Sequence, residues 1–172
     1  METERGGAGV GVHPGQAVRL NLGAGGKVID GWLSVDLAGE PDVRADVLDL
    51  PFPDGHADEV MAIHLLEHLY RWDAPAALRE WRRVLKPGGL LILELPDLVK
   101  CCRNVLGNQG ERMGAWGLYG DPGYRDPLMA HRWGWTFEEL RGELIAAGFR
   151  KVKEKVPQFH KKARDMRAEA RA

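Results

Sequence analysis

The residues that most clearly indicate a ligand-binding site are three glycines that follow an apolar run. Residues 18–22 (VRLNL) are largely apolar and β-prone, and Gly23, Gly25 and Gly26 come directly after them. This pattern predicts a buried strand that ends in a tight turn. Glycine tolerates positive φ and lets a ligand lie directly against the main chain. The turn therefore favours a polar ligand that is bound through the backbone.

Acidic residues follow the next two predicted strands. Asp36 lies at the end of the predicted strand 32–37, and Asp46 lies near the end of a short predicted strand, 43–47. In open α/β sheets, ligands bind outside the carboxyl ends of strands, where an acid often contacts ribose hydroxyls. Either acid alone would equally suit capping of a strand end. Their joint position with the glycines favours a nucleotide-like ligand.

The spacing of these residues departs from two common phosphate-binding patterns. A dinucleotide fingerprint has a third glycine and an acid about 20 residues further on, whereas Val28 replaces that glycine and Asp36 follows Gly23 after only 13 residues. Lys27 is followed by Val28, not by Ser or Thr, so a Walker loop is excluded. The first crossover should be too short for a full helix.

Composition and charge indicate one ordinary globular domain. The chain has 172 residues, of which 44% are hydrophobic and 28% charged, and no apolar run approaches the ~20 residues of a membrane span. We expect residues 1–15 to be a disordered tail and residues 16–172 a single domain. Residues 150–172 carry nine Lys or Arg and three Asp or Glu. Because this segment lacks interleaved aromatics, a nucleic-acid partner is disfavoured.

The two cysteines bear on the cellular setting. Cys101 and Cys102 are adjacent, which makes them a poor disulfide pair, and they are too few for a cysteine-based zinc site. We expect them to be packing residues. A cytoplasmic, reduced setting without a bound metal is the simplest expectation.

The remaining elements alternate between strands and helices. We expect a strand at 57–63, a helix capped by Asp73 that stops at 87–89, and an apolar strand at 90–95. Strand, helix, strand in this order predicts parallel pairing. Thr136 and Glu139 form a capping box for a helix that ends at Gly148, and strands at 149–156 and 166–171 follow, the last suited to a sheet edge.

The segment 97–135 has no clear periodicity. It contains Trp116, Tyr119, Tyr124 and Trp133 among glycines and polar residues. Long irregular segments are usually functional or disordered, and the aromatics argue against disorder. We interpret it as a lid or substrate-facing insertion whose aromatics line an acceptor pocket or pack within the lid.

Two histidines are candidate general bases, because imidazole titrates near neutral pH. His64 follows the fourth predicted strand, and His131 precedes the capping box. A structural role for either is the commoner outcome, since a base also needs suitable geometry. Residues 64–68 (HLLEH) also match the H-x-x-E-H pattern of inverted zinc peptidases. That pattern requires a helix, whereas His64 directly follows a strand and no third ligand is evident, so we disfavour it.

Several short motifs occur in a fixed order along the chain. They are LNLGAGG at 20–26, VDL at 35–37, ADVLDLPF at 45–52, EHL at 67–69, LKPGG at 85–89 and AGF at 147–149. In this order they resemble class I S-adenosylmethionine-dependent methyltransferases, most closely the small bacterial "type 11" group. The resemblance covers roughly residues 18–156, and the order of the motifs is more specific than any one of them.

The resemblance implies a fold, a cofactor and a reaction. The fold is a Rossmann-like α/β three-layer sandwich whose seven-stranded, mostly parallel sheet has an antiparallel last strand. The cofactor is S-adenosyl-L-methionine, and we expect a small-molecule or saccharide-like acceptor. The alternatives are a protein that binds the cofactor without catalysis and, less favoured because of the glycine spacing, a nicotinamide-dependent oxidoreductase.

The resemblance also implies which residues contact the cofactor. Asn21 stands where many relatives carry an acid, and its amide can still hydrogen-bond the cofactor's ammonium group. The implied contacts are Gly23, Ala24 and Gly25 to the methionine portion, Asp36 to the ribose, Leu37 to the adenine face, Asp46 and the Val47 amide to the adenine edge, and His64 beside the methionine moiety.

Overall fold

The computed structural model describes residues 16–172, so the predicted disordered tail lies outside the described residues. One sheet contains all seven strands, in the order β3-β2-β1-β4-β5-β7-β6. The strands are β1 (Arg19–Leu22), β2 (Leu33–Asp36), β3 (Val43–Arg44), β4 (Ala57–Ile63), β5 (Leu85–Pro96), β6 (Arg150–Lys155) and β7 (Asp165–Arg171). The helices are α1 (Ala74–Val84), α2 (Leu98–Leu106), α3 (Ala115–Tyr119) and α4 (Phe137–Ala146), with 3-10 turns η1 (Leu66–His68) and η2 (Pro127–Met129).

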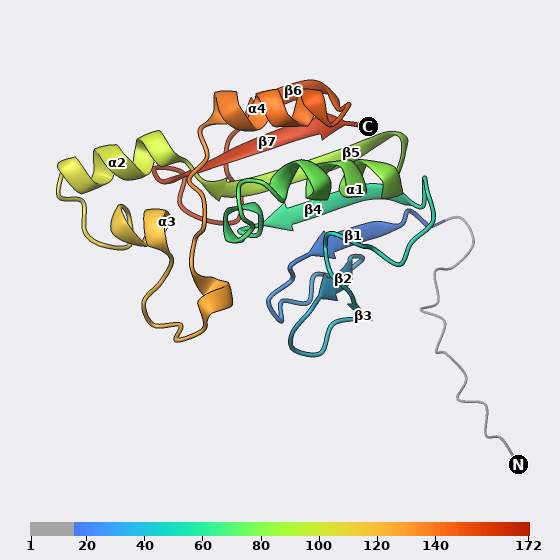
Figure 1. Ribbon diagram of the computed structural model, residues 1–172, viewed down its shortest axis with the longest axis horizontal. Helices are drawn as coiled ribbons and strands as arrows, with labels where there is room; N and C mark the ends of the chain where they lie inside the picture. Colours follow the sequence, from blue (N-terminus) through green and yellow to red (C-terminus); the bar gives the residue numbers. More distant parts are fainter. Residues whose placement is uncertain (1–15) are drawn as a thin grey trace, which may run out of the picture.

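The strand directions confirm the predicted sheet. β1 pairs in parallel with β2 and β4, β2 with β3, and β4 with β5, whereas β7 is antiparallel to both β5 and β6. The strand predicted at 57–63 coincides with β4. The parallel strands all end at the same edge of the sheet (Figure 1), which is where α/β proteins bind ligands.

The predicted edge position of the last strand is wrong. β7 lies inside the sheet and pairs on both sides, and β6 forms the edge. Met166 and Ala168 face the core and are buried, while the intervening Arg167 lies 3.7 Å from Glu94 and 2.9 Å from Glu169. The alternation of apolar and polar residues therefore reflects ion pairing within the sheet, not exposure at an edge.

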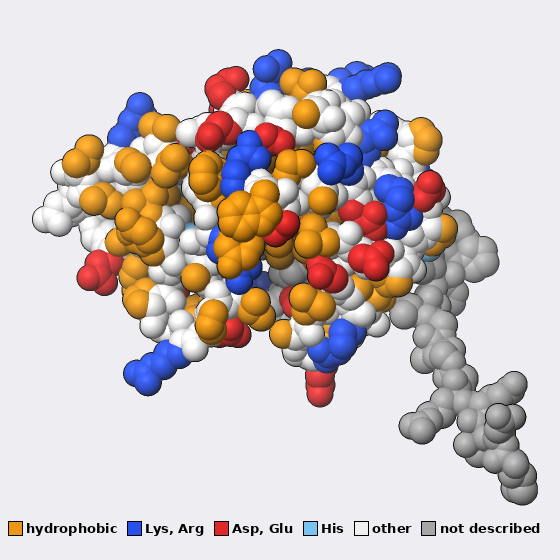
Figure 2. Space-filling model, viewed as in Figure 1, with side chains coloured by type: hydrophobic (Ala, Val, Ile, Leu, Met, Phe, Trp, Pro, Cys, Tyr) orange, Lys and Arg blue, Asp and Glu red, His pale blue; other side chains and the backbone are white. Residues whose placement is uncertain are grey.

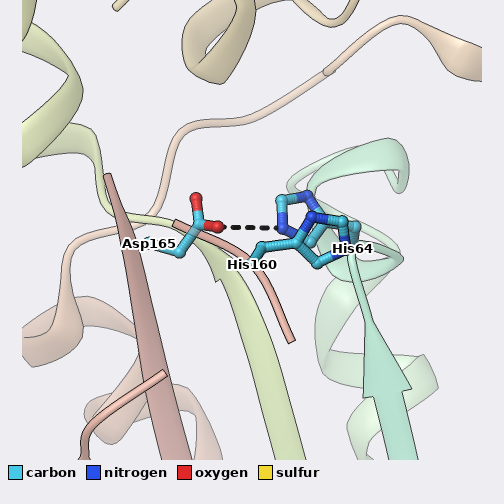
Figure 3. Close-up of side chains that lie close together, drawn as sticks. All are labelled: His64, His160 and Asp165. Carbon is cyan, nitrogen blue, oxygen red and sulfur yellow. Dashed lines mark hydrogen bonds and ion pairs between the residues drawn. The ribbon is translucent and has the colours of Figure 1, made fainter. Parts of the chain in front are cut away.

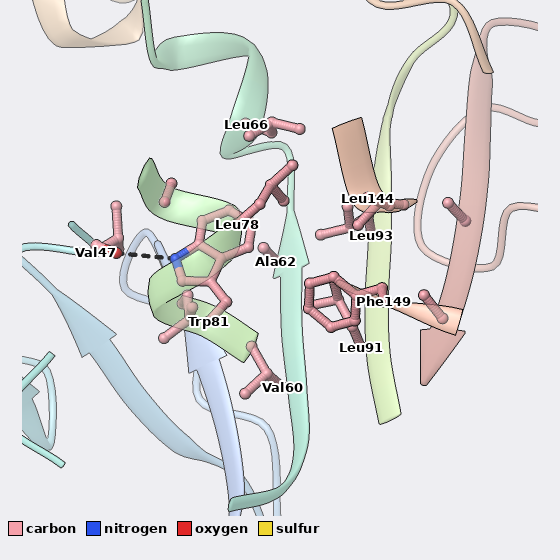
Figure 4. Packing of buried hydrophobic residues seen from close by; sticks show 14 of the residues in the cluster. Val47, Val60, Ala62, Leu66, Leu78, Trp81, Leu91, Leu93, Leu144 and Phe149 are labelled. Atoms are coloured by element: carbon pink, nitrogen blue, oxygen red, sulfur yellow. Dashed lines mark hydrogen bonds between the residues drawn. The ribbon is translucent and has the colours of Figure 1, made fainter. Parts of the chain in front are cut away.

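The core lies between one face of the sheet and helices α1 and α4 (Figure 4). Leu93 of β5 and Leu144 of α4 are fully buried there, together with Trp81 of α1. The indole nitrogen of Trp81 donates a hydrogen bond of 2.9 Å to the carbonyl of Val47. This bond connects the core to the loop that follows β3.

The opposite face of the sheet differs from the predicted three-layer sandwich. The connections between β1 and β2, between β2 and β3, and between β3 and β4 contain no α-helix. A doubly wound sheet covers its second face with helices in such connections. Here that face carries polar pairs such as Arg19 and Glu59, 3.5 Å apart. The short first crossover that the sequence predicts is confirmed, and it leaves no room for a helix.

The segment 97–135 contains two helices, α2 and α3, that the sequence analysis did not predict. Asp97 caps α2 by accepting a hydrogen bond from the Lys100 amide at 3.0 Å, and Cys101 packs inward. By contrast, Asp73 precedes α1 as predicted but makes no side-chain capping bond. Both new helices lie beyond the carboxyl ends of β4 and β5 (Figure 1). None of the described helices is long and apolar enough to span a bilayer.

Candidate functional site

The glycine turn follows β1 at the ligand-binding edge of the sheet. Gly23, Gly25 and Gly26 have φ values of 62°, 57° and 76°, a region that side chains disfavour. A Cβ atom at Gly23 would lie 2.6 Å from Cδ1 of Leu65, whereas one at Gly25 or Gly26 would meet nothing within 4 Å. Gly23 is therefore needed for close packing, and the other two glycines face open space in which a ligand can approach the backbone.

Asp36 at the end of β2 lies directly against this turn. One carboxylate oxygen accepts a hydrogen bond from the Gly25 amide at 2.9 Å, and the other accepts one from the Ala38 amide at 3.0 Å. Ala24, Gly26 and Asp36 line the same shallow hollow. Each carboxylate oxygen has a second lone pair, so Asp36 retains the capacity to accept hydrogen bonds from a ligand.

The segment after β3 lies next to Asp36. The amide of Ala45 donates to the carbonyl of Asp36 at 3.1 Å, which places Asp46 beside the end of β2. The carboxylate of Asp46 accepts from the Leu48 amide at 2.9 Å, a local turn contact of the kind that strand-end capping predicts. The Val47 side chain is buried, and Leu37 is 55% exposed. The structure thus brings the predicted adenosine contacts together, and their roles in binding stay predictions.

His64 follows β4 and enters a network of charged groups (Figure 3). Its φ is 53°, which is uncommon for a residue other than glycine, and its amide donates to the Glu94 carbonyl at 2.7 Å. Its Nδ1 lies 3.0 Å from Oε1 of Glu67, and its Nε2 lies 3.2 Å from Oδ2 of Asp165. The ring centroid of His160 lies 4.2 Å away.

The neighbouring carboxylates of Asp165 and Glu67 determine the protonation state of His64. Burial alone would lower its pKa, but the hydrogen bond to Asp165 and the contact with Glu67 raise the pKa to about 9. The ring is therefore protonated at neutral pH and cannot accept a further proton. This argues against the predicted role of His64 as a general base. The other predicted role, a position beside the methionine moiety of the cofactor, stays a prediction.

His160 comes from the loop between β6 and β7, and Asp165 is the first residue of β7. The carboxylate of Glu94 accepts three hydrogen bonds of 2.8–2.9 Å from the amides of residues 158–160. Asp165 also accepts from the Arg164 side chain at 2.6 Å. Burial would raise the pKa of Asp165, but His64 and Arg164 lower the pKa to about 2.

His131, the second predicted catalytic histidine, lies on the other side of Glu67. Its Nε2 is 4.0 Å from Oε1 of Glu67, the same oxygen that contacts His64, and its Nδ1 is 3.0 Å from the Gly117 carbonyl. Burial lowers the pKa of His131, an effect that Glu67 opposes. The structure therefore brings both histidines together through one buried carboxylate.

His64, His131, Glu67, His160 and Asp165 form a histidine cluster, and the last three were not predicted from the sequence. Glu67 carried a signal, since it lies within the HLLEH motif that was considered for zinc. His160 and Asp165 lie in the basic C-terminal segment, more than 90 residues from His64, and no local pattern marks them.

The insertion is hydrogen-bonded to the backbone of residues 67 and 68 through Arg132. The Arg132 amide donates to the Glu67 carbonyl at 2.7 Å, and the Arg132 guanidinium donates to the His68 carbonyl at 2.8 Å. Tyr119 and Tyr124 are 74% and 60% exposed. Hydrophobic side chains gather on the side of the molecule that α2 and α3 form (Figure 2).

Comparison with known sequences identifies the chain's relatives. Residues 23–93 match the family described as "Methyltransferase domain". A putative methyltransferase of Encephalitozoon cuniculi is 35% identical over 85 residues, which is 46% of this chain and 40% of that protein. A ubiquinone/menaquinone biosynthesis C-methyltransferase of Pseudomonas putida is 53% identical over 53 residues, which is 30% of this chain and 20% of that protein. The chain thus spans less than half the length of these relatives.

Solved structures share the fold at low sequence identity. A S-adenosylmethionine-dependent methyltransferase from Methanosarcina mazei has a TM-score of 0.64 at 16% identity, over 91% of this chain and 92% of that one. A 1,6-didemethyltoxoflavin-N1-methyltransferase from Burkholderia thailandensis, solved with its namesake compound and S-adenosylhomocysteine, has a TM-score of 0.59 at 19% identity, over 90% and 70%. Residues 23–93 thus resemble a methyltransferase domain, and the chain shares the fold of S-adenosylmethionine-dependent methyltransferases.

Proposed function

We propose that this chain binds S-adenosylmethionine at the carboxyl ends of β1 to β4 and transfers its methyl group to a small-molecule acceptor. The observation that carries the proposal is the position of Asp36, whose carboxylate lies 2.9 Å from the Gly25 amide beside open glycine backbone. The similar proteins include a ubiquinone/menaquinone biosynthesis C-methyltransferase and a 1,6-didemethyltoxoflavin-N1-methyltransferase, which supports an acceptor of small-molecule size.

The residues after β2 and β3 suit the adenosine part of this cofactor. Asp36 would accept hydrogen bonds from the ribose hydroxyls through its remaining lone pairs. The exposed side chain of Leu37 would cover the adenine ring, and Asp46 with the Val47 amide would contact the adenine edge. The acids and the glycine turn follow neighbouring strands, which is the arrangement that binds nucleotide-like ligands in α/β sheets.

The residues after β1 and β4 suit the amino-acid part. Gly23, Ala24 and Gly25 would bind it through the backbone, and the Asn21 amide would accept from its ammonium group. His64 would lie beside the amino-acid part, with its two ring nitrogens held by Glu67 and Asp165. The packing of Leu65 on Gly23 keeps the segment after β4 against the glycine turn.

The chain's part in the reaction is mainly positioning. When bound, the cofactor supplies a methyl group on a sulfonium that an acceptor atom displaces in line. The protein must hold the acceptor opposite that carbon and exclude water, which the insertion at 97–135 would do as a lid. His131 is the better candidate for a base, because burial keeps its ring neutral.

Calorimetry with S-adenosylmethionine, S-adenosylhomocysteine and NAD tests the proposal. We expect the first two to bind and NAD not to bind. Asp36→Ala should weaken cofactor binding by about 1–3 kcal/mol, the scale of hydrogen bonds to a charged group. Asp30→Ala, which removes an exposed acid from the same connection, is the matched control and should bind as the wild type does. Binding of NAD alone, or an unchanged affinity in Asp36→Ala, would overturn the assignment.

An acceptor panel separates catalysis from cofactor binding alone. Transfer of a labelled methyl group to small hydroxylated, aromatic or saccharide-like compounds is the expected result. Tight cofactor binding without turnover on any of them would instead favour a binding protein that has lost catalysis.

A further inference from the structure

The Glu67 carboxylate is buried without the hydrogen bonds that such a group normally makes. Its side chain is 2% exposed, and neither oxygen accepts a hydrogen bond of normal geometry from residues 16–172. His64 Nδ1 approaches Oε1 to 3.0 Å and forms an ion pair with it. Buried charges in proteins are paired and hydrogen-bonded, or they coordinate metals. Protonated His64 pairs with the charge of Glu67, but Oε2 has no partner among the described residues and can accept a further ligand.

Two histidine rings face the same carboxylate with their proton-bearing nitrogens turned away. Nδ1 of His131 lies 3.0 Å from the Gly117 carbonyl, and Nδ1 of His68 lies 3.2 Å from the Ala130 carbonyl. A carbonyl only accepts, so Nδ1 carries the proton in each ring and Nε2 keeps a lone pair in the neutral form. A ring N–H held by a backbone carbonyl is the usual arrangement of histidines that ligate metals.

His64 pairs with Oε1 of Glu67 from one side, but no donor lies between Glu67 and His131 on the other side. Nε2 of His131 and Oε1 of Glu67 are both acceptors and lie 4.0 Å apart. With no proton between them, their lone pairs repel each other, and a cation placed between them would turn the repulsion into attraction. The side chains of Glu67, His68 and His131 each offer one ligand atom, and these atoms lie within 4.8 Å of one another.

We propose that Glu67, His68 and His131 bind a divalent transition-metal ion, with Zn²⁺ as the best match. Two imidazoles and one carboxylate are an established zinc donor set that leaves a coordination position for water or another oxygen ligand. Imidazole disfavours Mg²⁺ and Ca²⁺, which take oxygen ligands. Zinc bonds of about 2.0–2.2 Å need ligand atoms about 3.3–3.5 Å apart, which small side-chain rotations would achieve.

The neighbouring group of His64, His160 and Asp165 is equally close but unsuited to a metal. Its ligand atoms also lie within 4.8 Å of one another. However, Asp165 already accepts two hydrogen bonds from the Arg164 guanidinium, at 2.6 and 3.0 Å. That guanidinium would repel a metal ion, and His64 already contacts a carboxylate through each nitrogen. The HLLEH motif thus contributes His64 to one group and Glu67 and His68 to the other. Only the group of Glu67, His68 and His131 has lone pairs free to bind a cation.

Zinc titration of the full chain, freed of metal by a chelator and without cofactor, tests the proposal. We expect one equivalent to bind in competition with a chromophoric chelator, to raise the melting temperature, and to be replaceable by Co²⁺ with a tetrahedral absorption spectrum. His68→Gln and His131→Gln should each weaken binding at least about 10-fold. His160→Gln is the matched control and should bind as the wild type does.

Three results would overturn the site. They are the absence of saturable uptake by the wild type, equal affinity in wild type, His68→Gln and His131→Gln, or loss of affinity in His160→Gln alone. The wild-type Co²⁺ spectrum decides the question even if a variant fails to fold. The titration contains no S-adenosylmethionine, so a failure to bind zinc would leave the methyltransferase proposal intact. A metal ion would also occupy the lone pair of His131, so this site and the base role exclude each other.

Discussion

The two halves of the candidate site are built in opposite ways. In the adenosine half, Gly25 and Asp36 are 11 residues apart, and the contact between them joins a backbone amide to a side chain. In the histidine half, His64 and Asp165 are 101 residues apart, and both partners are side chains. The first half depends on the spacing of residues along the chain. The second depends on the order of strands in the sheet, because β7 must lie beside β5 to bring Asp165 to His64.

The halves also differ in burial, and this separates their expected roles. Asp36 is half-buried at an open hollow and can exchange its contacts for a ligand. Asp165 is fully buried and already satisfied by His64 and Arg164. Removing one partner of a buried ion pair leaves an uncompensated charge, whereas altering an accessible acid does not. Substitutions in the two halves should therefore affect different properties.

Asp165→Asn should have the largest effect on stability. It removes the charge that faces His64 and Arg164, and the loss should be about 3 kcal/mol in the free energy of unfolding. Asp36→Asn is the matched control, and we expect it to lose about 1 kcal/mol or less. Urea denaturation at pH 7 measures both. Equal losses would show that burial does not distinguish the two halves.

The loss of stability in acid should depend on the Asp165 carboxylate. The pKa of Asp165 is about 2 in the folded chain, below its ordinary value of 3.8. A depressed pKa contributes stability that is fully present above pH 3.8 and is lost as the pH falls toward 2. The contribution is about 2 kcal/mol, from about 1.4 kcal/mol per pKa unit. Urea midpoints measured between pH 5 and pH 2 should fall less steeply in Asp165→Asn, and an unchanged slope would contradict this origin.

The parts of the fold that could be predicted from the sequence are those with local signals. The glycine turn, the strand at 57–63 and the capping box each depend on residues within about ten positions of one another, and each occurs as predicted. The order of the motifs also carried the resemblance to methyltransferases, and residues 23–93 match a methyltransferase domain. The adenosine half of the site could be proposed for the same reason, because its members follow consecutive strands.

The parts that could not be predicted depend on tertiary contacts. The alternation at 166–171 predicts a strand, but nothing local says that the Arg167 charge meets Glu94 on a neighbouring strand. The helix α2 has only nine residues, and apolar side chains such as Val99 and Leu106 are exposed in it, so its apolar residues do not mark a buried face. Glu67 is buried because the insertion covers it, which the motif around it could not reveal.

Gly23→Ala and Gly25→Ala should separate packing from ligand access within the adenosine half. Both residues have positive φ, so each substitution should cost about 1–2 kcal/mol of stability. Gly23→Ala should cost more than Gly25→Ala, because its new Cβ displaces Leu65, whereas Gly25→Ala meets open space. Thermal denaturation gives the stabilities, and calorimetry should show weaker cofactor binding in both variants. Equal stabilities would mean that Leu65 moves at no cost.

Thr136→Ala should have the smallest effect, because the capping box is a purely local structure. The Thr136 hydroxyl accepts from the Glu139 amide at 3.2 Å, and the Glu139 carboxylate accepts from the Thr136 amide at 3.2 Å. Loss of such a cap costs about 1 kcal/mol, and Thr136→Ser should restore most of it. Urea denaturation of both variants checks this. The adjacent Trp135 carbonyl accepts from the Leu98 amide at 2.9 Å, so the start of α4 also holds the start of the insertion. A loss well above 1 kcal/mol would therefore mean that the cap stabilises the insertion over the histidines, and that the two halves of the site are less independent than their contacts indicate.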